Sequence, residues 1–196
     1  MVETEVKIPF AGDPQQARAL IERHGYTVSE PRTLESDQLF DHPGAELKAA
    51  DQLLRLRRSG ARSTVTYKGP AARERYKSRE EIEFDVSDAS NFELVLNRLG
   101  YTPGFRYEKY RTKFAGTPEP GIITIDETPI GVYLEIEGPK RWIDQVARAL
   151  GYTTREYITA SYGRLYLGWC EAHGRDPGDM VFRNARPPLD TKKTTR

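Results

Sequence analysis

Charged side chains recur at every second position in several short segments of this 196-residue chain. The like-charged pairs are Glu3 with Glu5, Glu81 with Glu83, Glu135 with Glu137, Arg55 with Arg57, and Lys109 with Arg111. Side chains two positions apart on a β-strand point to the same face, so each pair occupies one face of a predicted strand. Like charges placed this way repel, and their repetition favours a bound ligand of opposite charge.

If these faces point into a common interior, the two kinds of charge suit different parts of one ligand. Ammonium and guanidinium groups bind phosphate oxygens. The basic candidates are Lys7, Arg55, Arg57, Lys68, Lys109 and Arg111. Carboxylates are hard oxygen ligands that suit Mg²⁺ or Mn²⁺. The acidic candidates are Glu3, Glu5, Asp126, Glu135 and Glu137. Together the two sets match a polyphosphate that carries divalent metal.

An ordinary antiparallel sheet with one solvated face is the alternative interpretation of the same alternation. Glu3-x-Glu5-x-Lys7 alone does not distinguish the two interpretations, because three alternating charged residues are common. A solvated face usually mixes threonine, lysine and glutamate, whereas most of these strands carry nearly one sign of charge. The whole set therefore favours an interior site.

The elements that must position these residues are mostly strands. Period-2 patterns predict strands near 2–9, 33–41, 53–59, 62–69, 77–86, 104–115, 121–128 and 131–138. Gly60 and the segment 129–131 separate neighbouring strands and predict two hairpins. Helical periodicity appears at 13–25, 88–99, 140–150 and 158–172. Eight strands are enough to close a barrel that holds a ligand.

Composition excludes several classes of protein. Thirty Lys and Arg residues against 29 Asp and Glu give a formal net charge of +1, without the basic excess of a nucleic-acid binder. One cysteine, Cys170, excludes an intramolecular disulfide framework. No apolar run reaches the roughly 18 residues that span a bilayer, and the acidic start is unlike a signal peptide. We therefore expect a cytoplasmic protein without a membrane or nucleic-acid partner.

The last 22 residues differ from the rest of the chain. Residues 175–196 contain four prolines and glycines at 177, 178, 187 and 188, few apolar residues, and more basic than acidic side chains. This composition predicts a flexible tail after a single domain of residues 1–174.

The ordered series of motifs resembles the CYTH superfamily, the triphosphate-tunnel metalloenzymes. The resemblance begins at Glu3-x-Glu5-x-Lys7 and extends to about residue 170. The motifs between are Ser36-Asp37-Gln38-Leu39-Phe40-Asp41, Leu54-Arg55-Leu56-Arg57, Thr66-Tyr67-Lys68-Gly69-Pro70, Arg79-x-Glu81-x-Glu83, Lys109-x-Arg111, Ile125-Asp126-Glu127 and Leu134-Glu135-Ile136-Glu137. Each motif is short, and it is their order along the chain that makes the resemblance specific.

The resemblance implies an α+β fold, a closed eight-stranded antiparallel β-barrel with helices packed outside and a triphosphate tunnel inside. The six basic candidates would hold the phosphates, and the five acidic candidates one or two Mg²⁺ or Mn²⁺ ions. The residues expected to act in catalysis are Glu3, Glu5, Lys7, Asp126, Glu135 and Glu137. Residues with a less defined place near the site are Arg79, Glu81, Glu83, Tyr162 and Arg164. Helix packing is the alternative role for the last two.

Members of this superfamily catalyse different reactions. The segment 157–162, Tyr-Ile-Thr-Ala-Ser-Tyr, resembles the class IV adenylyl cyclase branch, which implies conversion of ATP to cyclic AMP and pyrophosphate. Hydrolysis of inorganic or thiamine triphosphate is the close alternative. A noncatalytic polyphosphate or nucleotide-binding module is a third, and the many carboxylates argue against it. A triphosphate is the expected partner in each case, and related cyclases make a homodimer an expectation.

Overall fold

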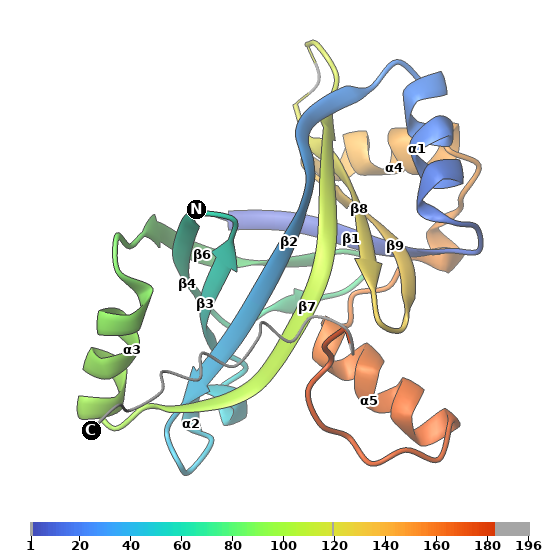
Figure 1. Ribbon diagram of the computed structural model, residues 1–196. Helices are drawn as coiled ribbons and strands as arrows, with labels where there is room; N and C mark the ends of the chain where they lie inside the picture. The colour runs from blue at the N-terminus through green and yellow to red at the C-terminus, as the bar shows by residue number, and fades with distance from the viewer. Residues whose placement is uncertain (1, 119, 183–196) are drawn as a thin grey trace, which may run out of the picture.

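Antiparallel pairing joins eight strands into a closed ring in the computed structural model, which describes residues 2–118 and 120–182 (Figure 1). The strands are β1 (Val2–Phe10), β2 (Thr27–Asp41), β3 (Leu53–Ser59), β4 (Arg62–Lys68), β5 (Ala72–Arg73), β6 (Lys77–Asp85), β7 (Thr102–Ala115), β8 (Ile122–Thr128) and β9 (Gly131–Glu137). The ring runs β1-β9-β8-β7-β2-β3-β4-β6 and returns to β1, while the two-residue β5 extends β6. The predicted barrel is confirmed.

The strand β6 closes the ring because its two ends pair with different neighbours. Residues 81–85 pair with β4, and residues 77–80 pair with the start of β1. The predicted hairpins are also present. Gly60 turns the chain between β3 and β4 with φ +58, and Gly131 begins β9 with φ +135. Glycine adopts these backbone angles without the steric cost that other residues meet.

Helices cover the outer face of the barrel. Within the described residues these are α1 (Pro14–Arg23), α2 (Glu46–Ala49), α3 (Ala89–Arg98), α4 (Lys140–Ala149) and α5 (Tyr162–Ala172), with a short 3-10 helix at Thr154–Glu156. In Figure 1, α1 and α4 lie together on one side of the barrel and α3 lies on the opposite side. None of these helices is long and apolar enough to cross a membrane.

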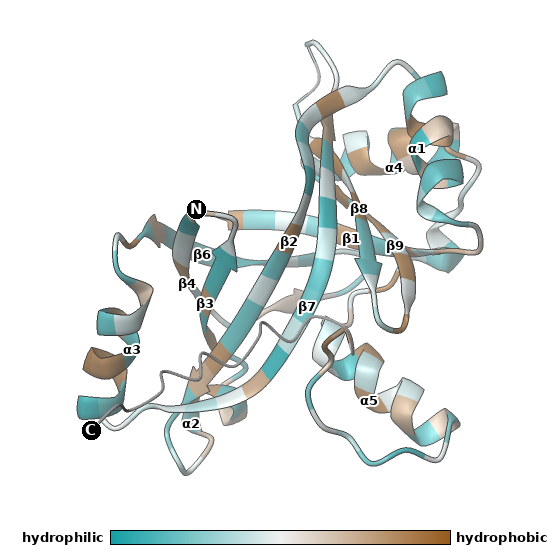
Figure 2. Ribbon diagram, viewed as in Figure 1, coloured by the Kyte–Doolittle hydropathy of each residue, from teal (hydrophilic) through white to brown (hydrophobic). Residues whose placement is uncertain are grey.

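Apolar clusters hold the helices to the strands, and two of them lie under α1, α4 and α3. One joins Ile21 of α1 and Ile143 of α4 to outward-facing residues of β1, β8 and β9, among them Ile123 and Leu134. The other joins Leu96 of α3 to the outer faces of β2, β3 and β4. Figure 2 shows that the long strands β2 and β7 carry both hydrophilic and apolar residues along their length. The core therefore lies outside the barrel wall and leaves the inner face to polar groups.

The C-terminal part packs against β7. Met180 is fully buried, and its N–H donates to the carbonyl of Arg106 at 3.0 Å. The N–H of Glu108 in turn donates to the carbonyl of Met180 at 2.8 Å. Residues 175–182 of the predicted tail include this contact, while 183–196 lie outside the described residues. The division into a 1–174 domain and a tail stays a prediction.

Two predicted element starts differ clearly from the structure, and two short elements were not predicted. β2 begins at Thr27, earlier than the predicted 33, because it follows β7 along nearly its full length with irregular register. α5 begins at Tyr162, later than 158, because the Ser161 side chain accepts from the N–H of Arg164 and caps the helix there. α2 and β5 were not predicted, since four and two residues are too few to show a period.

Replacing Gly121, which lies directly before β8, should destabilise the barrel. A Cβ atom there would lie 2.3 Å from the carbonyl oxygen of Glu137 and 2.4 Å from Trp142. We expect Gly121→Ala to lower the free energy of unfolding by about 2 kcal/mol in urea titrations. Gly168→Ala in α5, where nothing lies within 4 Å, is the control and should raise it by about 0.5–1 kcal/mol. Equal stability of the two variants would contradict this packing.

Candidate active site

A cavity of about 250 Å³ lies inside the barrel and is lined mostly by charged side chains. Ten of the eleven predicted phosphate- and metal-binding residues line it, namely Glu3, Glu5, Lys7, Arg55, Arg57, Lys68, Lys109, Arg111, Glu135 and Glu137. The less defined candidates Arg79, Glu81, Glu83 and Tyr162 line it as well. Asp126 and Arg164 do not. The predicted inward faces of separate strands thus meet in one cavity.

Strand register pairs most of these charges. Residues directly opposite in an antiparallel pair point to the same face, so Lys7 of β1 faces Glu135 of β9 at 2.9 Å between Nζ and Oε1. Lys68 of β4 faces Glu81 of β6 and forms a buried ion pair with it. Burial of an ion costs free energy unless a partner compensates it, and register supplies these partners.

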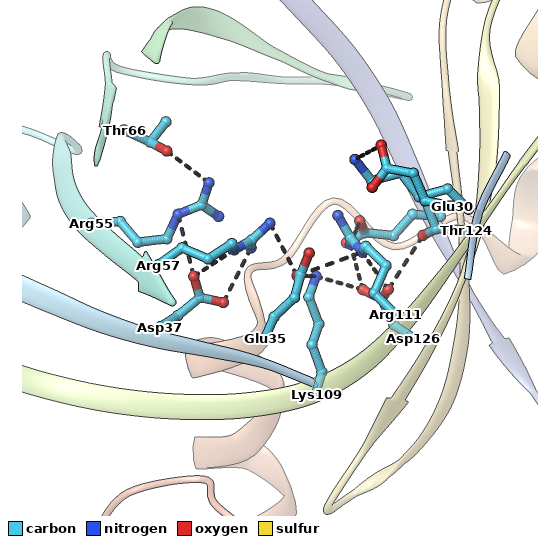
Figure 3. Close-up of polar contacts among 12 residues, drawn as sticks. Glu30, Glu35, Asp37, Arg55, Arg57, Thr66, Lys109, Arg111, Thr124 and Asp126 are labelled. Carbon is cyan, nitrogen blue, oxygen red and sulfur yellow. Dashed lines mark hydrogen bonds and ion pairs between the residues drawn. The ribbon is translucent and has the colours of Figure 1, made fainter. Parts of the chain in front are cut away.

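Asp37 holds the two arginines of β3. Its carboxylate accepts from Arg57 Nε at 2.8 Å and from Arg57 Nη2 at 3.1 Å, a forked arrangement (Figure 3). Arg55 Nε lies 3.4 Å from the same carboxylate, and Arg55 Nη2 donates to Thr66 at 2.8 Å. Asp37 is fully buried, so both arginines are fixed from the wall side while they line the cavity.

Asp126 occupies the corresponding place in β8. Its carboxylate accepts from Lys109 Nζ at 2.7 Å, from Arg111 Nε at 2.6 Å and from the Tyr162 hydroxyl at 2.7 Å. It is fully buried and lies behind these side chains. Both its oxygens already have donors, which sets it apart from the carboxylates that line the cavity. Its role as a metal ligand stays a prediction.

Tyr162 connects α5 to the basic residues. Lys7 Nζ and Lys109 Nζ lie 5.2 and 5.1 Å from the centre of its ring, within the range of cation–π contact. Burial, with the nearby charges of Asp126 and Glu135, raises the pKa of its hydroxyl well above the ordinary value, so it is a donor at neutral pH. Arg164, two residues further on, is exposed and contributes nothing to the cavity wall.

Carboxylates crowd the β1–β9 side of the cavity. Glu5 and Glu137 lie directly opposite one another, a repulsive arrangement. Burial, together with repulsion from Glu5 and Glu135, raises the pKa of Glu137. Burial, the charge of Glu137 and a hydrogen bond with Glu81 raise the pKa of Glu3 to about 8. Although burial acts to raise it, Lys7 and Lys77 hold the pKa of Glu5 below its ordinary value.

This donor set fits a hard divalent cation. Within 2–118 and 120–182, no three acidic, histidine or cysteine side chains stand in a ready-made metal cage. Glu137 nevertheless lies directly opposite Glu5, and its charge raises the pKa of Glu3. A divalent ion beside Glu137 would relieve this repulsion. The residues present therefore suit Mg²⁺ or Mn²⁺.

The charged and aromatic residues of the site that the sequence prediction missed include Lys77, Lys113, Tyr107, Glu35 and Asp37. Lys77 lines the cavity and donates to Glu5 at 2.5 Å, Tyr107 lines it beside α5, and Glu35 and Asp37 lie behind the bases. Lys77 has the same strand parity as Arg79 and Glu81, and Glu35 has that of Asp37. The parity rule would have found these charges. Tyr107 also shares the strand parity of Lys109 and Arg111, but an aromatic side chain was not among the charged residue types that the prediction followed.

The fold and the site define a class of protein, a closed antiparallel barrel whose charged interior can hold an anion and its cations. Comparison with known families specifies that class, since the CYTH domain family matches residues 1–162. The chain belongs to the CYTH domain family.

Several relatives carry names that mention an activity. A Methanocaldococcus jannaschii protein named "Putative adenylate cyclase" is 26% identical over 138 residues, which are 70% of this chain and 77% of that protein. A structure of a "putative adenylate cyclase" from Vibrio parahaemolyticus is similar over 84% of this chain and 97% of that one, with 17% identity and a TM-score of 0.74. A "putative adenylyl cyclase" from Hippeastrum with "a dominant" triphosphatase activity matches 90% of this chain and 97% of that one, with 15% identity and a TM-score of 0.61.

The raised pKa of Glu3 predicts a pH dependence of stability in the absence of divalent metal. Glu3 has a pKa of about 8 when folded, against 4.5 ordinarily, so the folded state holds its proton more tightly. Folding is therefore favoured below about pH 4.5, and this contribution is lost as pH rises towards about 8. In urea titrations across that range with EDTA present, Glu3→Gln should lose less stability than the wild type as pH rises.

The control for this experiment is Glu22→Gln, at an exposed position that pairs with Arg18 on α1. It should keep the wild-type dependence on pH. An equal loss of stability in Glu3→Gln and wild type would contradict a protonated Glu3.

Proposed function

We propose that the chain is a divalent-metal-dependent adenylyl cyclase that binds the triphosphate of ATP in the barrel. The main support is that basic side chains able to bind phosphate and carboxylates able to bind a metal ion line the same cavity. Names of relatives that mention adenylate cyclase support the proposal. Binding of phosphate alone does not call for so many carboxylates, so the acidic set supports an enzyme.

One end of the cavity favours a nucleoside triphosphate over an inorganic one. Leu39, Phe105 and Tyr107 line the cavity next to the start of α5. The rings of Phe105 and Tyr107 are stacked on one another, with centres 5.7 Å apart, and give this end of the cavity an aromatic surface. Such a surface suits a nucleobase, whereas an all-phosphate substrate has no apolar part to place there.

The residues would divide the reaction between them. Lys7, Lys109 and Arg111, with Arg55, Arg57 and Lys68, would bind the phosphates and neutralise the charge that develops on departing pyrophosphate. Glu3, Glu5, Glu135 and Glu137 would hold the divalent ion. A bound ion would supply a lowered pKa for the ribose 3′-hydroxyl. The 3′-hydroxyl would lose its proton to solvent as the 3′-oxygen bonds to the α-phosphorus, and the bond between that phosphorus and the bridging oxygen of the β-phosphate would break.

Triphosphate hydrolysis is the second candidate. The same bases and carboxylates would present a terminal phosphate to water, and the Hippeastrum relative, named for a dominant triphosphatase activity, supports this alternative. The difference between the two reactions lies in the nucleophile and in the nucleoside contacts at the apolar end.

Analysis of products distinguishes the two reactions. The protein is incubated with ATP and, separately, with tripolyphosphate, each with Mg²⁺ or Mn²⁺, and the products are separated by chromatography. We expect cyclic AMP and pyrophosphate from ATP. Orthophosphate from tripolyphosphate, without cyclic AMP from ATP, would replace the cyclase proposal with hydrolysis.

Variants of the metal-suited carboxylates test the assignment of the ion. We expect Glu3→Gln and Glu137→Gln to lower turnover by roughly 100-fold or more, because each removes an oxygen ligand. Both should fold, since their raised pKa values mean that a neutral side chain is tolerated there. Glu127→Gln, outside the barrel in an ion pair with Arg32, is the matched control and should keep wild-type turnover. Full metal-dependent activity in either cavity variant would refute the assignment.

A further inference from the structure

Charges inside the barrel form two layers. Nine basic and six acidic side chains line the cavity, a formal excess of three positive charges. Three more acidic side chains, Glu35, Asp37 and Asp126, are buried behind them and do not line the cavity. Among the described residues the two layers together are formally neutral. A bare polyphosphate therefore meets bases whose charge is already compensated.

Glu35 differs from the other two carboxylates of the rear layer. Its Oε2 lies 3.0 Å from Arg57 Nη1, 3.6 Å from Lys109 Nζ and 3.9 Å from Arg111 Nε (Figure 3). This oxygen is buried, yet it has no hydrogen bond of good geometry with any residue that the structure describes. Asp37, by contrast, accepts two hydrogen bonds from Arg57, and Asp126 accepts hydrogen bonds from Lys109, Arg111 and Tyr162. Glu35 thus acts on the bases mainly through its charge.

Each base near Glu35 also has a second carboxylate. Arg57 keeps the forked contact with Asp37, and Lys109 and Arg111 keep their bonds to Asp126. Loss of the Glu35 charge would leave none of the three without an acidic partner, so the fold does not depend on it. The three bases all line the cavity, where phosphate oxygens would compete with Glu35 for them.

We propose that Glu35 is a specificity-determining residue that makes the cavity select metal-loaded over metal-free triphosphate. This rests on the proposed function, in which Arg57, Lys109 and Arg111 bind phosphate. A negative charge close to these bases opposes any anion in proportion to that anion's net charge. Metal-free tripolyphosphate is opposed most, and divalent ions reduce the opposition by neutralising the ligand.

Calorimetric titration with inorganic tripolyphosphate, once with Mg²⁺ and once with EDTA, measures this selectivity as a ratio of Kd values. In Glu35→Gln we expect the metal-free Kd to fall by about 10-fold or more, and the Kd with Mg²⁺ to change much less. Glu35→Asp keeps the charge and should keep a ratio close to wild type. Glu127→Gln, outside the barrel, is the control for an unrelated loss of acid.

Other outcomes overturn the proposal in distinguishable ways. An unchanged metal-free Kd in Glu35→Gln, or equal changes with and without Mg²⁺, would show that the charge does not set selectivity. Glu35→Met supplies a second neutral side chain of similar length, and failure of both neutral variants to fold would show a structural role instead. If wild type binds no tripolyphosphate even with Mg²⁺, the proposed function itself fails.

Discussion

Compensation of buried charge is the constraint on which this barrel depends. An ion inside a protein is costly unless an opposite charge and hydrogen bonds replace its water. Here the antiparallel register places Lys7 against Glu135, while Asp37 and Asp126 hold bases of adjacent strands. Because the ring is closed, the charged inner faces of the strands are not open to bulk solvent. The interior must therefore be nearly neutral before any ligand binds.

The opposing faces of the strands make that interior possible. Apolar side chains outside the wall pack under α1, α4 and α3, and this packing supplies the stability that a charged core cannot. The β1–β9 side departs from full compensation, because Glu5 and Glu137 face one another and Glu3 stays protonated near neutral pH. These carboxylates repel one another while most other charges of the interior are paired. An added cation would therefore stabilise the protein most on this side.

Relatives with this fold carry the names of different activities, and the charged part of the cavity does not explain the difference. Bases and carboxylates serve cyclisation and hydrolysis alike, since both begin with a bound triphosphate. In the proposed function the two would diverge at the end of the cavity beside α5, where Phe105, Tyr107 and Tyr162 come together. Residues around Met180 hold this end by pairing with β7. In the proposed function, specificity would therefore depend on an end of the cavity that β7 and the start of α5 build together.

Residue type and spacing were enough to predict most of the strands, their inward faces and nearly all of the charged residues that line the cavity. Alternation has a fixed period of two, so residue type and spacing reveal which side chains share a face. How deep each charged side chain lies, and which partner it meets, follow from the packing of the strands. Asp126 carries the same signal as Glu135, yet it lies behind Lys109 and Arg111 because its side chain is short and their chains are long. Glu35 and Asp37 had the right parity, but their position behind the bases follows from cross-strand neighbours. Register between distant strands sets those neighbours, and no local pattern encodes it.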